Sequence, residues 1–254
     1  MTQLANNAPL TCEGLARSFG GVKAVQGVSL ALPAGAVTAL VGPNGAGKTT
    51  VFNLITGNLK ADEGTAQIRG RPIIGLKPWQ VARLGVARSF QDLRLFTQMN
   101  VRDNVLAATE RGAWFWQGGD RRARLAAAEA AMEATGLTAL AEARAVDLAY
   151  AERKFLSMAR ILAAGADIWL LDEPASGLDL SSRLRFGQLL RDARARGVAI
   201  CLIEHNLDVV VDLADRIAFL DRGLVLAEGA PREIMTDPKL AAIYFGDRSH
   251  EAAA

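Results

Sequence analysis

A glycine-rich stretch with one lysine is the part of the sequence best suited to chemistry. Residues 42–50 read GPNGAGKTT and directly follow the apolar run VTALV. Glycines let backbone N–H groups turn inward around phosphates, where a Cβ would interfere. Lys48 supplies a mobile positive charge to the β- and γ-phosphates, Thr49 offers a hydroxyl to Mg²⁺, and a helix starting here adds its positive end. A chance lysine in a glycine-rich turn is disfavoured, because a strand precedes the stretch and a helical pattern follows it. The residues expected to bind ATP here are Gly42, Pro43, Asn44, Gly45, Ala46, Gly47, Lys48, Thr49 and Thr50.

Two neighbouring carboxylates are the next candidates. Asp172 ends the apolar run IWLLD, and Glu173 follows it. The carboxyl ends of parallel strands converge, so a second strand ending in acids is expected beside the phosphate-binding loop. Asp172 would hold Mg²⁺ through water, and Glu173 would orient or polarise the attacking water with little pKa adjustment. Taken alone, the pair also fits an ordinary strand end with two solvated acids; beside the glycine-rich loop, the catalytic interpretation is favoured.

The strands and helices that position these residues are predicted from the hydrophobic pattern and from the glycines and prolines that separate the segments. The runs LTCEGLARSF and AVQGVSLALP, separated by Gly and Pro, predict antiparallel strands leading into VTALV as a central strand. A helix is expected from Lys48 to Ile55, a hairpin around 64–73, and a strand over 86–91 that ends in a glutamine.

Strand and helix patterns alternate in the second half of the chain. The expected order is a strand at 168–172, a helix over 181–196, a strand at 198–204 and a helix over 206–214, followed by a final hairpin. Such alternation predicts an α/β fold, a parallel sheet with helices on its faces. Between the halves, Ala, Arg and Glu recur at helical spacing. We therefore expect one domain, 1–254, with a helical subdomain inserted at 92–164.

Bulk composition narrows the function classes. The chain has 254 residues, half of them hydrophobic, which is enough for one large domain. A net charge of +2 implies no field for a polyanion, so no nucleic-acid partner is expected. Cys12 and Cys201 match no metal spacing and no disulfide framework, which favours a reducing cytoplasm. The N-terminus lacks the charged and apolar regions of a secretion signal, and no apolar run approaches the roughly 18 residues of a membrane span.

Five motifs carry a family resemblance. GPNGAGKTT, the glutamine of VARSFQ, LLDEP, SGLD at 176–179 and the histidine of IEHN follow the order and spacing of ABC-type ATPases, over nearly the whole chain. The resemblance implies a P-loop NTPase fold with a mixed central sheet, an antiparallel β subdomain and an inserted helical subdomain.

The same resemblance assigns roles to four further residues. It implies that Gln91 touches Mg²⁺ and joins the ATP core to the insert, that Asp179 links two ATP sites across a dimer, and that His205 reaches the γ-phosphate. Phe19 resembles the aromatic residue that stacks on adenine. Outside this context, a histidine after a strand is often a satisfied partner of nearby backbone, and an aromatic residue between strands usually packs in the core.

One motif departs from the family pattern. Relatives carry a five-residue signature, commonly LSGGQ, whose hydroxyl and N–H groups grip the γ-phosphate bound by the other protomer. Here residues 148–152 read LAYAE, so Ala149 has no hydroxyl and Ala151 replaces a glycine. If that glycine needs a positive φ or a close approach, the methyl group costs about 1 kcal/mol or more. The hypothesis is functional asymmetry: an intact site of its own, and a degraded contribution to its partner. Without the family, LAYAERKF is simply the start of a helix.

The resemblance also implies partners. One ATP domain per chain implies a dimer with a second ATP-binding subunit, for which a heterodimer is favoured, at the cytoplasmic face of the inner membrane. Separate transmembrane permeases would dock near Leu95, Phe96 and Met99, although core packing explains each of these equally well. Trp114, Phe115 and Trp116 also suggest some exposure to a partner, because adjacent helical positions point about 100° apart. The basic run 121–124 is expected to be a solvated helix face.

Stretches such as RSFGGVKAVQGVSL and IEHNLDVVVDLADRIAFLDRG resemble ATP-binding subunits of bacterial uptake systems for branched-chain (hydrophobic) amino acids, with urea, amides or aromatic acids as related cargo. A periplasmic solute-binding protein would then act indirectly. The first alternative is a lipopolysaccharide-export ATPase. A second is an ATPase of DNA repair or ribosome handling, but such proteins need long insertions that are absent here. A third is a nucleotide-dependent scaffold that does not hydrolyse ATP, or a subunit that hydrolyses it weakly. The sequence does not name the solute.

Overall fold

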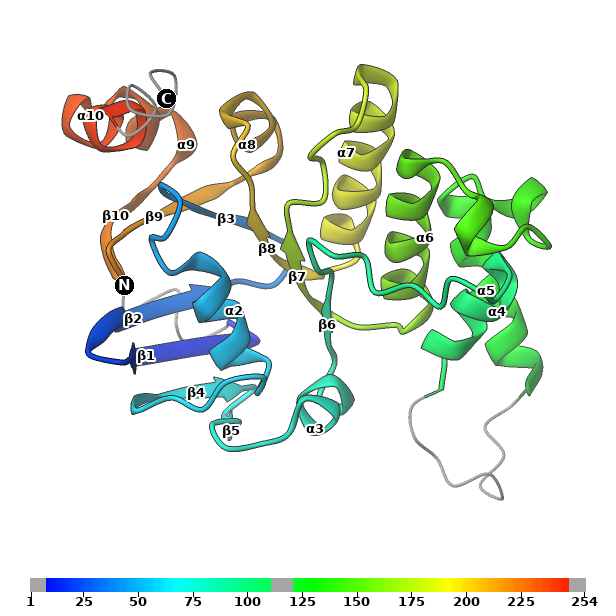
Figure 1. The fold of residues 1–254 in the computed structure, drawn as a ribbon, viewed down its shortest axis with the longest axis horizontal. Coiled ribbons are helices and arrows are strands. Elements are labelled where there is room, and N and C mark those ends of the chain that lie inside the picture. The colour runs from blue at the N-terminus through cyan, green and yellow to red at the C-terminus, as the bar shows by residue number, and fades with distance from the viewer. Residues whose placement is uncertain (1–7, 111–120, 247–254) are drawn as a thin grey trace.

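The computed structural model describes residues 8–110 and 121–246 as two sheets with helices packed around them (Figure 1). The smaller sheet is antiparallel, with the strand order β2-β1-β4-β5. Leu10 of β1 lies opposite Leu32 of β2 on one side and Ile68 of β4 on the other. The predicted opening strands and the hairpin around 64–73 are therefore confirmed. The strands are β1 (Leu10–Phe19), β2 (Val22–Leu32), β4 (Glu63–Ile68) and β5 (Arg71–Pro72).

The larger sheet has six strands in the order β10-β9-β3-β8-β7-β6. All neighbouring pairs are parallel except β9 and β10, which form the predicted terminal hairpin. Every residue of β3, β7 and β8 is buried, which explains why these strands appear in the sequence as continuous apolar runs. The strands are β3 (Val37–Val41), β6 (Val86–Arg88), β7 (Ile168–Asp172), β8 (Ala199–Ile203), β9 (Arg216–Asp221) and β10 (Leu224–Gly229).

Separate cores cover the two faces of this sheet, because alternate side chains of a strand point to opposite faces. Trp169 and Leu171 of β7 pack in a cluster with α6 (Tyr150–Ala163) and α7 (Leu180–Ala195). Ile168 and Leu170 belong to the other cluster, with α2 (Lys48–Ile55) and the antiparallel sheet. The parallel strands therefore lie in the middle of the molecule, and their carboxyl ends reach one common edge.

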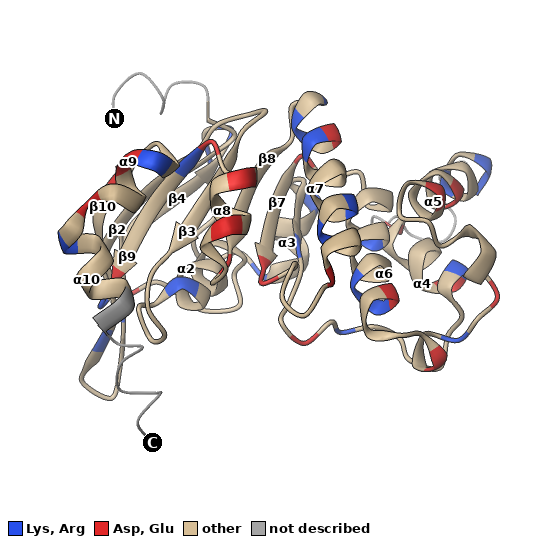
Figure 2. Cartoon of the chain, turned by 90° about the horizontal axis from the view of Figure 1, so that it is seen from above, with Lys and Arg blue, Asp and Glu red and all other residues tan. Residues whose placement is uncertain are grey.

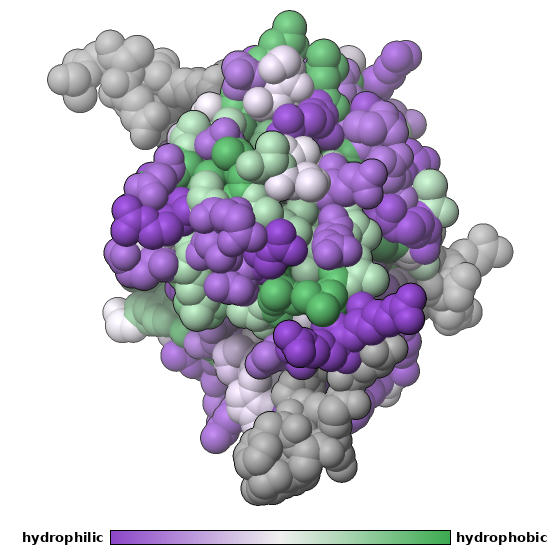
Figure 3. Space-filling model, turned by 90° about the vertical axis from the view of Figure 1, so that its right-hand side faces the viewer, coloured by the Kyte–Doolittle hydropathy of each residue, from purple (hydrophilic) through white to green (hydrophobic). Residues whose placement is uncertain are grey.

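Three helices pack against one another at the end of the molecule farthest from β10 (Figure 1). They are α4 (Val101–Ala108), α5 (Arg121–Ala134) and α6, and the short turns η1 (Thr138–Leu140) and η2 (Ala145–Asp147) lie between α5 and α6. Their apolar side chains share the core of β7 and α7. On the outer face of this region, hydrophobic and hydrophilic residues are intermixed (Figure 3). Trp114, Phe115 and Trp116 lie outside the described residues.

The remaining helices pack against strands of the larger sheet. They are α3 (Pro78–Arg83), α8 (Leu207–Leu213), α9 (Pro231–Thr236) and α10 (Pro238–Gly246). The last three pack on β3 and β9 in a third apolar cluster. Basic and acidic residues are scattered along the described chain, and α8 contains acidic residues (Figure 2). Across residues 8–110 and 121–246, no helix has the length and apolarity needed to span a bilayer.

One predicted element is shorter than expected. β6 ends at Arg88, whereas the sequence pattern predicted a strand to Gln91. Ser89 still donates its N–H to Leu170 O at 3.0 Å, but Phe90 then lies between two guanidinium groups, 4.7 Å from that of Arg88 and 3.9 Å from that of Arg94. Arg94 itself has a φ of +45°. The prediction was wrong because these contacts turn the chain away from the sheet edge, and Gln91 becomes an exposed loop residue.

Candidate active site

The phosphate-binding loop connects β3 to α2, and its glycines are required by close approach. A Cβ on Gly42 would lie 1.8 Å from Leu220 O, and one on Gly47 would lie 2.4 Å from Ala24 O. Gly47 also has a φ of +103° directly before the first turn of α2. The neighbouring strands therefore press against the loop from behind, and the other side of the loop, with Asn44, Gly45 and Thr49, is exposed.

Lys48 lies across the mouth of this loop. Its ammonium donates to Gly42 O at 2.6 Å and to Pro43 O at 2.8 Å, and the residue is only 7% exposed. Burial lowers the pKa of Lys48, and the carboxylates of Glu173 and Asp172 oppose that shift. The positive charge therefore lies near the loop carbonyls and near the carboxylates of Asp172, which ends β7, and Glu173, which follows it.

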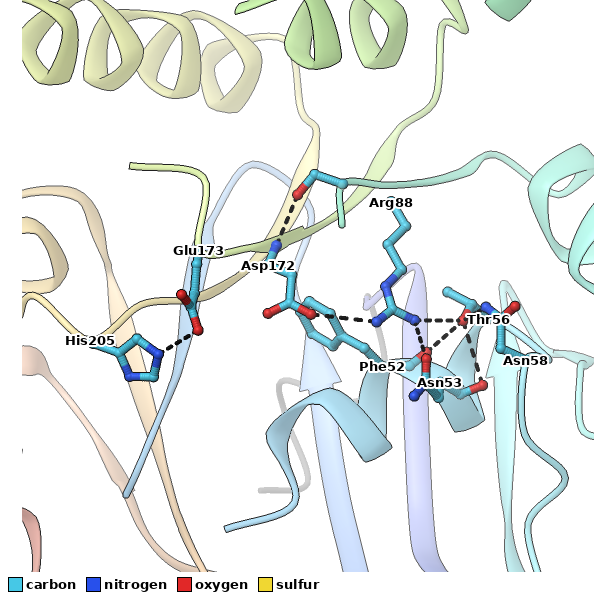
Figure 4. Close-up of polar contacts among 9 residues, drawn as sticks. Phe52, Asn53, Thr56, Asn58, Arg88, Asp172, Glu173 and His205 are labelled. Carbon is cyan, nitrogen blue, oxygen red and sulfur yellow. Dashed lines mark hydrogen bonds and ion pairs between the residues drawn. The ribbon is translucent and has the colours of Figure 1, made fainter. Parts of the chain in front are cut away.

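Asp172 is buried at the end of β7 and pairs with a residue that the sequence analysis missed. Arg88 Nη2 lies 3.5 Å from Asp172 Oδ2, while its Nη1 donates to Asn53 Oδ1 at 2.7 Å (Figure 4). The Asp172 N–H donates to Ser89 Oγ at 2.9 Å. Burial raises the pKa of Asp172, and the Arg88 guanidinium opposes the rise. A basic residue in an otherwise apolar edge strand was the one sequence signal for Arg88.

Glu173 and His205 are brought together, although they come from different strands. His205 Nε2 contacts Glu173 Oε1, so the imidazole donates and the carboxylate accepts (Figure 4). Glu173 has a φ of +49°, an uncommon conformation for a residue with a Cβ, and its N–H donates to Ile203 O at 2.9 Å. The backbone of His205 is held from α10, because the Tyr244 hydroxyl donates to His205 O at 2.8 Å.

A cleft of about 640 Å³ opens beside this pair. It is lined by residues 175–178, by Arg183, and by residues 204–208, which include His205. Buried Glu204 lies at its base and accepts from the Ala175 N–H at 2.8 Å. The cleft therefore lies between the segment after Glu173 and the segment that carries His205.

Three other predicted site residues are exposed and lie away from these contacts. Gln91 belongs to the loop after β6. Asp179 caps α7, where its carboxylate accepts from the Ser182 N–H at 2.7 Å, a bond that lowers its pKa. Phe19 is 43% exposed at the end of β1, with the Arg17 guanidinium 5.0 Å from its ring centroid. Within the described residues, the structure does not bring these three side chains together.

The stretch LAYAE forms the start of α6. Ala149 precedes the helix, and its N–H donates to the Glu152 carboxylate at 2.7 Å. Ala151 is helical and does not have a positive φ, so the methyl group carries no penalty of that kind, while a penalty from close approach to a partner's nucleotide stays a prediction. Tyr150 is 54% exposed, and its ring lies 2.8 Å from where a Cβ on Gly177 would be. The first turn of α6 therefore contacts the segment that follows Glu173.

Of the proposed partner contacts, Phe96 and Met99 are exposed, while Leu95 packs partly into the core. The Phe96 ring lies 5.1 Å from the guanidinium of Arg160. At the start of α5, Arg124 pairs with Glu110 at 3.2 Å on an exposed face, in line with a solvated basic run.

Comparisons with known proteins place these features in context. Residues 25–176 match the family model described as ABC transporter. The chain is 39% identical over 249 residues to the high-affinity branched-chain amino acid transport ATP-binding protein LivG of Salmonella typhimurium, covering 94% of this chain and 98% of that one. It is 35% identical over 239 residues to the lipopolysaccharide export system ATP-binding protein LptB of Acidithiobacillus ferridurans, covering 94% and 97%.

The fold is also similar to a solved structure. The crystal structure of the ADP conformation of MJ1267, an ATP-binding cassette of an ABC transporter, superposes with a TM-score of 0.85 at 28% identity. The match covers 94% of this chain and 99% of that one.

Proposed function

Because the chain belongs to the ABC transporter family, as an ATP-hydrolysing subunit, we propose that it powers uptake of a branched-chain or other hydrophobic amino acid, or of a related small organic acid or amide. The observation that carries the proposal is the pairing of Glu173 with His205 beside an intact phosphate-binding loop, in a chain 39% identical to LivG along nearly all of its length. Transport would proceed through separate permease subunits.

The residues present fit ATP and Mg²⁺. Gly42 and Gly47 let the loop pack closely against Leu220 O and Ala24 O, which leaves its other side exposed, and Lys48 holds a positive charge at the loop. In this proposal the loop residues 42–50 bind the phosphates and Phe19 stacks on the adenine. Thr49, Gln91 and Asp172 would hold Mg²⁺, which when bound supplies charge neutralisation on the phosphate oxygens.

Hydrolysis depends on the groups after β7 and β8. Glu173 orients and polarises the attacking water, since its carboxylate is only partly exposed and is fixed by His205. His205 reaches the γ-phosphate from the exposed side of the pair. Both side chains project from the same sheet edge as the loop, so positioning accounts for much of the catalysis.

The partners follow from the same proposal. The chain would form a dimer with a second ATP-binding subunit, with Asp179 linking the two sites, and the alanines of LAYAE favour a different partner chain over a second copy. The segment 92–164 would act as a subdomain that meets the permeases near Leu95, Phe96 and Met99, at the cytoplasmic face of the membrane. A periplasmic solute-binding protein would deliver the cargo.

The test is uptake of radiolabelled leucine, glutamate and urea in cells lacking this chain, complemented with wild type or with Glu173→Gln. We expect wild type to restore uptake of one hydrophobic solute and Glu173→Gln to restore none, although it is made at the same level. Unchanged uptake of every solute in the deleted cells would refute the import proposal.

The 35% identity to LptB favours lipopolysaccharide export as a second candidate. In that case deletion would leave solute uptake intact and would instead reduce lipopolysaccharide at the cell surface. Measuring both quantities in the same strains separates the two transport directions.

A further inference from the structure

A buried lysine on α6 lies under the candidate catalytic residues and has no role in the site described above. Lys154 is 7% exposed, and its neighbours along the helix, Phe155 and Leu156, are core residues. Its ammonium donates to Glu173 O at 2.7 Å. A buried ammonium needs such a partner, because an unpaired charge is strongly disfavoured away from water.

The peptide that Lys154 contacts is held in an uncommon conformation. Glu173 has a φ of +49°, which costs conformational energy in a residue with a Cβ. Both of its backbone polar groups are used: the N–H donates to Ile203 O, and the carbonyl accepts from Lys154. The first bond reaches β8 and the second comes from α6, and the carbonyl also accepts from the Ser176 N–H at 3.4 Å. Together they fix the direction in which the Glu173 side chain leaves the backbone.

Lys154 also faces the strand that carries the switch histidine. Glu204 directly precedes His205, is 2% exposed, and accepts from the Ala175 N–H at 2.8 Å. Burial lowers the pKa of Lys154, and the negative charges of Glu204 and Glu173 oppose that shift. One ammonium is therefore placed among the helix that begins with LAYAE, the segment after β7 and the end of β8.

We propose that Lys154 is a positioning residue for ATP hydrolysis in its own protomer, holding the Glu173 backbone so that the carboxylate meets His205. The inference rests on the proposed catalytic role of Glu173. It adds a second role for α6, whose first turn is otherwise expected to serve only the partner's nucleotide. A displacement of α6 relative to β7 withdraws the ammonium from Glu173 O and loosens the catalytic carboxylate.

The test compares ATP turnover of purified Lys154→Met and Lys154→Arg with Arg185→Met as a matched control. Arg185 also donates to a backbone carbonyl of another element, Thr135 O at 3.2 Å, and lies over Phe155 at 3.8 Å, but it is remote from Glu173. Because small misplacements of a reacting group slow catalysis by up to about a hundredfold, we expect Lys154→Met to lower kcat by about 10- to 100-fold. KM for ATP should stay within about twofold, since the phosphate-binding loop is untouched. Lys154→Arg should recover most of kcat, and Arg185→Met should stay within about twofold of wild type.

A second comparison shows whether Lys154 acts through Glu173. In a Glu173→Gln background, we expect Lys154→Met to cause little further loss in single-turnover hydrolysis, because two residues that act as a unit are not additive. If the fold-losses in rate of the two single variants multiply in the double variant, the proposal is refuted. It is also refuted if the kcat of Lys154→Met stays within twofold of wild type, or if Lys154→Met and Arg185→Met lose kcat equally. If Lys154→Met does not fold, Lys154→Ala, which also removes the donor, takes its place under the same criteria. Wild-type turnover in Glu173→Gln itself would instead refute the catalytic role assigned to Glu173.

Discussion

Arg88 offers the sharpest test of how the site is held together. Its side chain and that of Asp172 are 6% and 5% exposed, so Arg88→Met leaves a buried carboxylate without its counter-charge. Removing one partner of a buried ion pair costs about 3–5 kcal/mol. The 3.5 Å separation places this pair at the low end, and the lost bond to Asn53 adds about 1 kcal/mol. We therefore expect the free energy of unfolding to fall by about 3–4 kcal/mol.

A second substitution separates the charge from the packing. Asp172→Asn in the Arg88→Met background removes the unpaired charge, so it should restore about 1–2 kcal/mol, although it would also remove a carboxylate proposed to hold Mg²⁺. The assay is urea unfolding followed by circular dichroism. Arg83→Met, in an exposed arginine stacked on Trp79 at 4.7 Å, is the matched control and should change stability by less than about 0.5 kcal/mol. A further loss of stability from Asp172→Asn, in place of a gain, would refute the ion-pair explanation.

Three further predictions concern the loop, the helix start and the buried acid. Gly42→Ala should abolish ATP binding measured by calorimetry, because its Cβ would lie 1.8 Å from Leu220 O; unchanged affinity would contradict the loop geometry. Ala151→Gly should raise ATP turnover of the dimeric chain while destabilising α6 by about 0.5–1 kcal/mol, and equal rates would end the hypothesis of functional asymmetry. Burial raises the pKa of Glu204, so the folded state holds its proton more tightly than the unfolded chain. Its contribution to stability is present at low pH and is lost as the pH rises through the folded pKa, and Glu204→Gln should flatten that part of a series of urea unfolding curves.

The sequence predicted those structural features that depend on the residues of a single segment. The buried strands β3, β7 and β8 each depend on local residue types, and their predictions are confirmed in the structure. The contact between Glu173 and His205 was not predicted, although both residues follow parallel strands whose carboxyl ends converge.

Contacts that depend on side chains crossing between elements were not predictable from the sequence in the same way. Arg88 and Lys154 stand in stretches that suggest an edge strand and an exposed helix face, yet both are directed inward to acids contributed by other segments. The early end of β6 has a similar origin, because stacking of Phe90 between two arginines outweighs the strand pattern. The φ of Ala151 could not be read from the family glycine, since a helical N-terminus accepts either residue.

The bond from the Tyr244 hydroxyl to His205 O ties the last described helix to one of the candidate catalytic residues. A protein shortened before this tyrosine would keep the five motifs of the ATP site and still lose a hydrogen bond that holds the backbone of His205. For biochemical work, affinity tags therefore belong at the amino terminus. Low ATPase activity in a protein truncated at its carboxyl end would say little about the activity of the full chain.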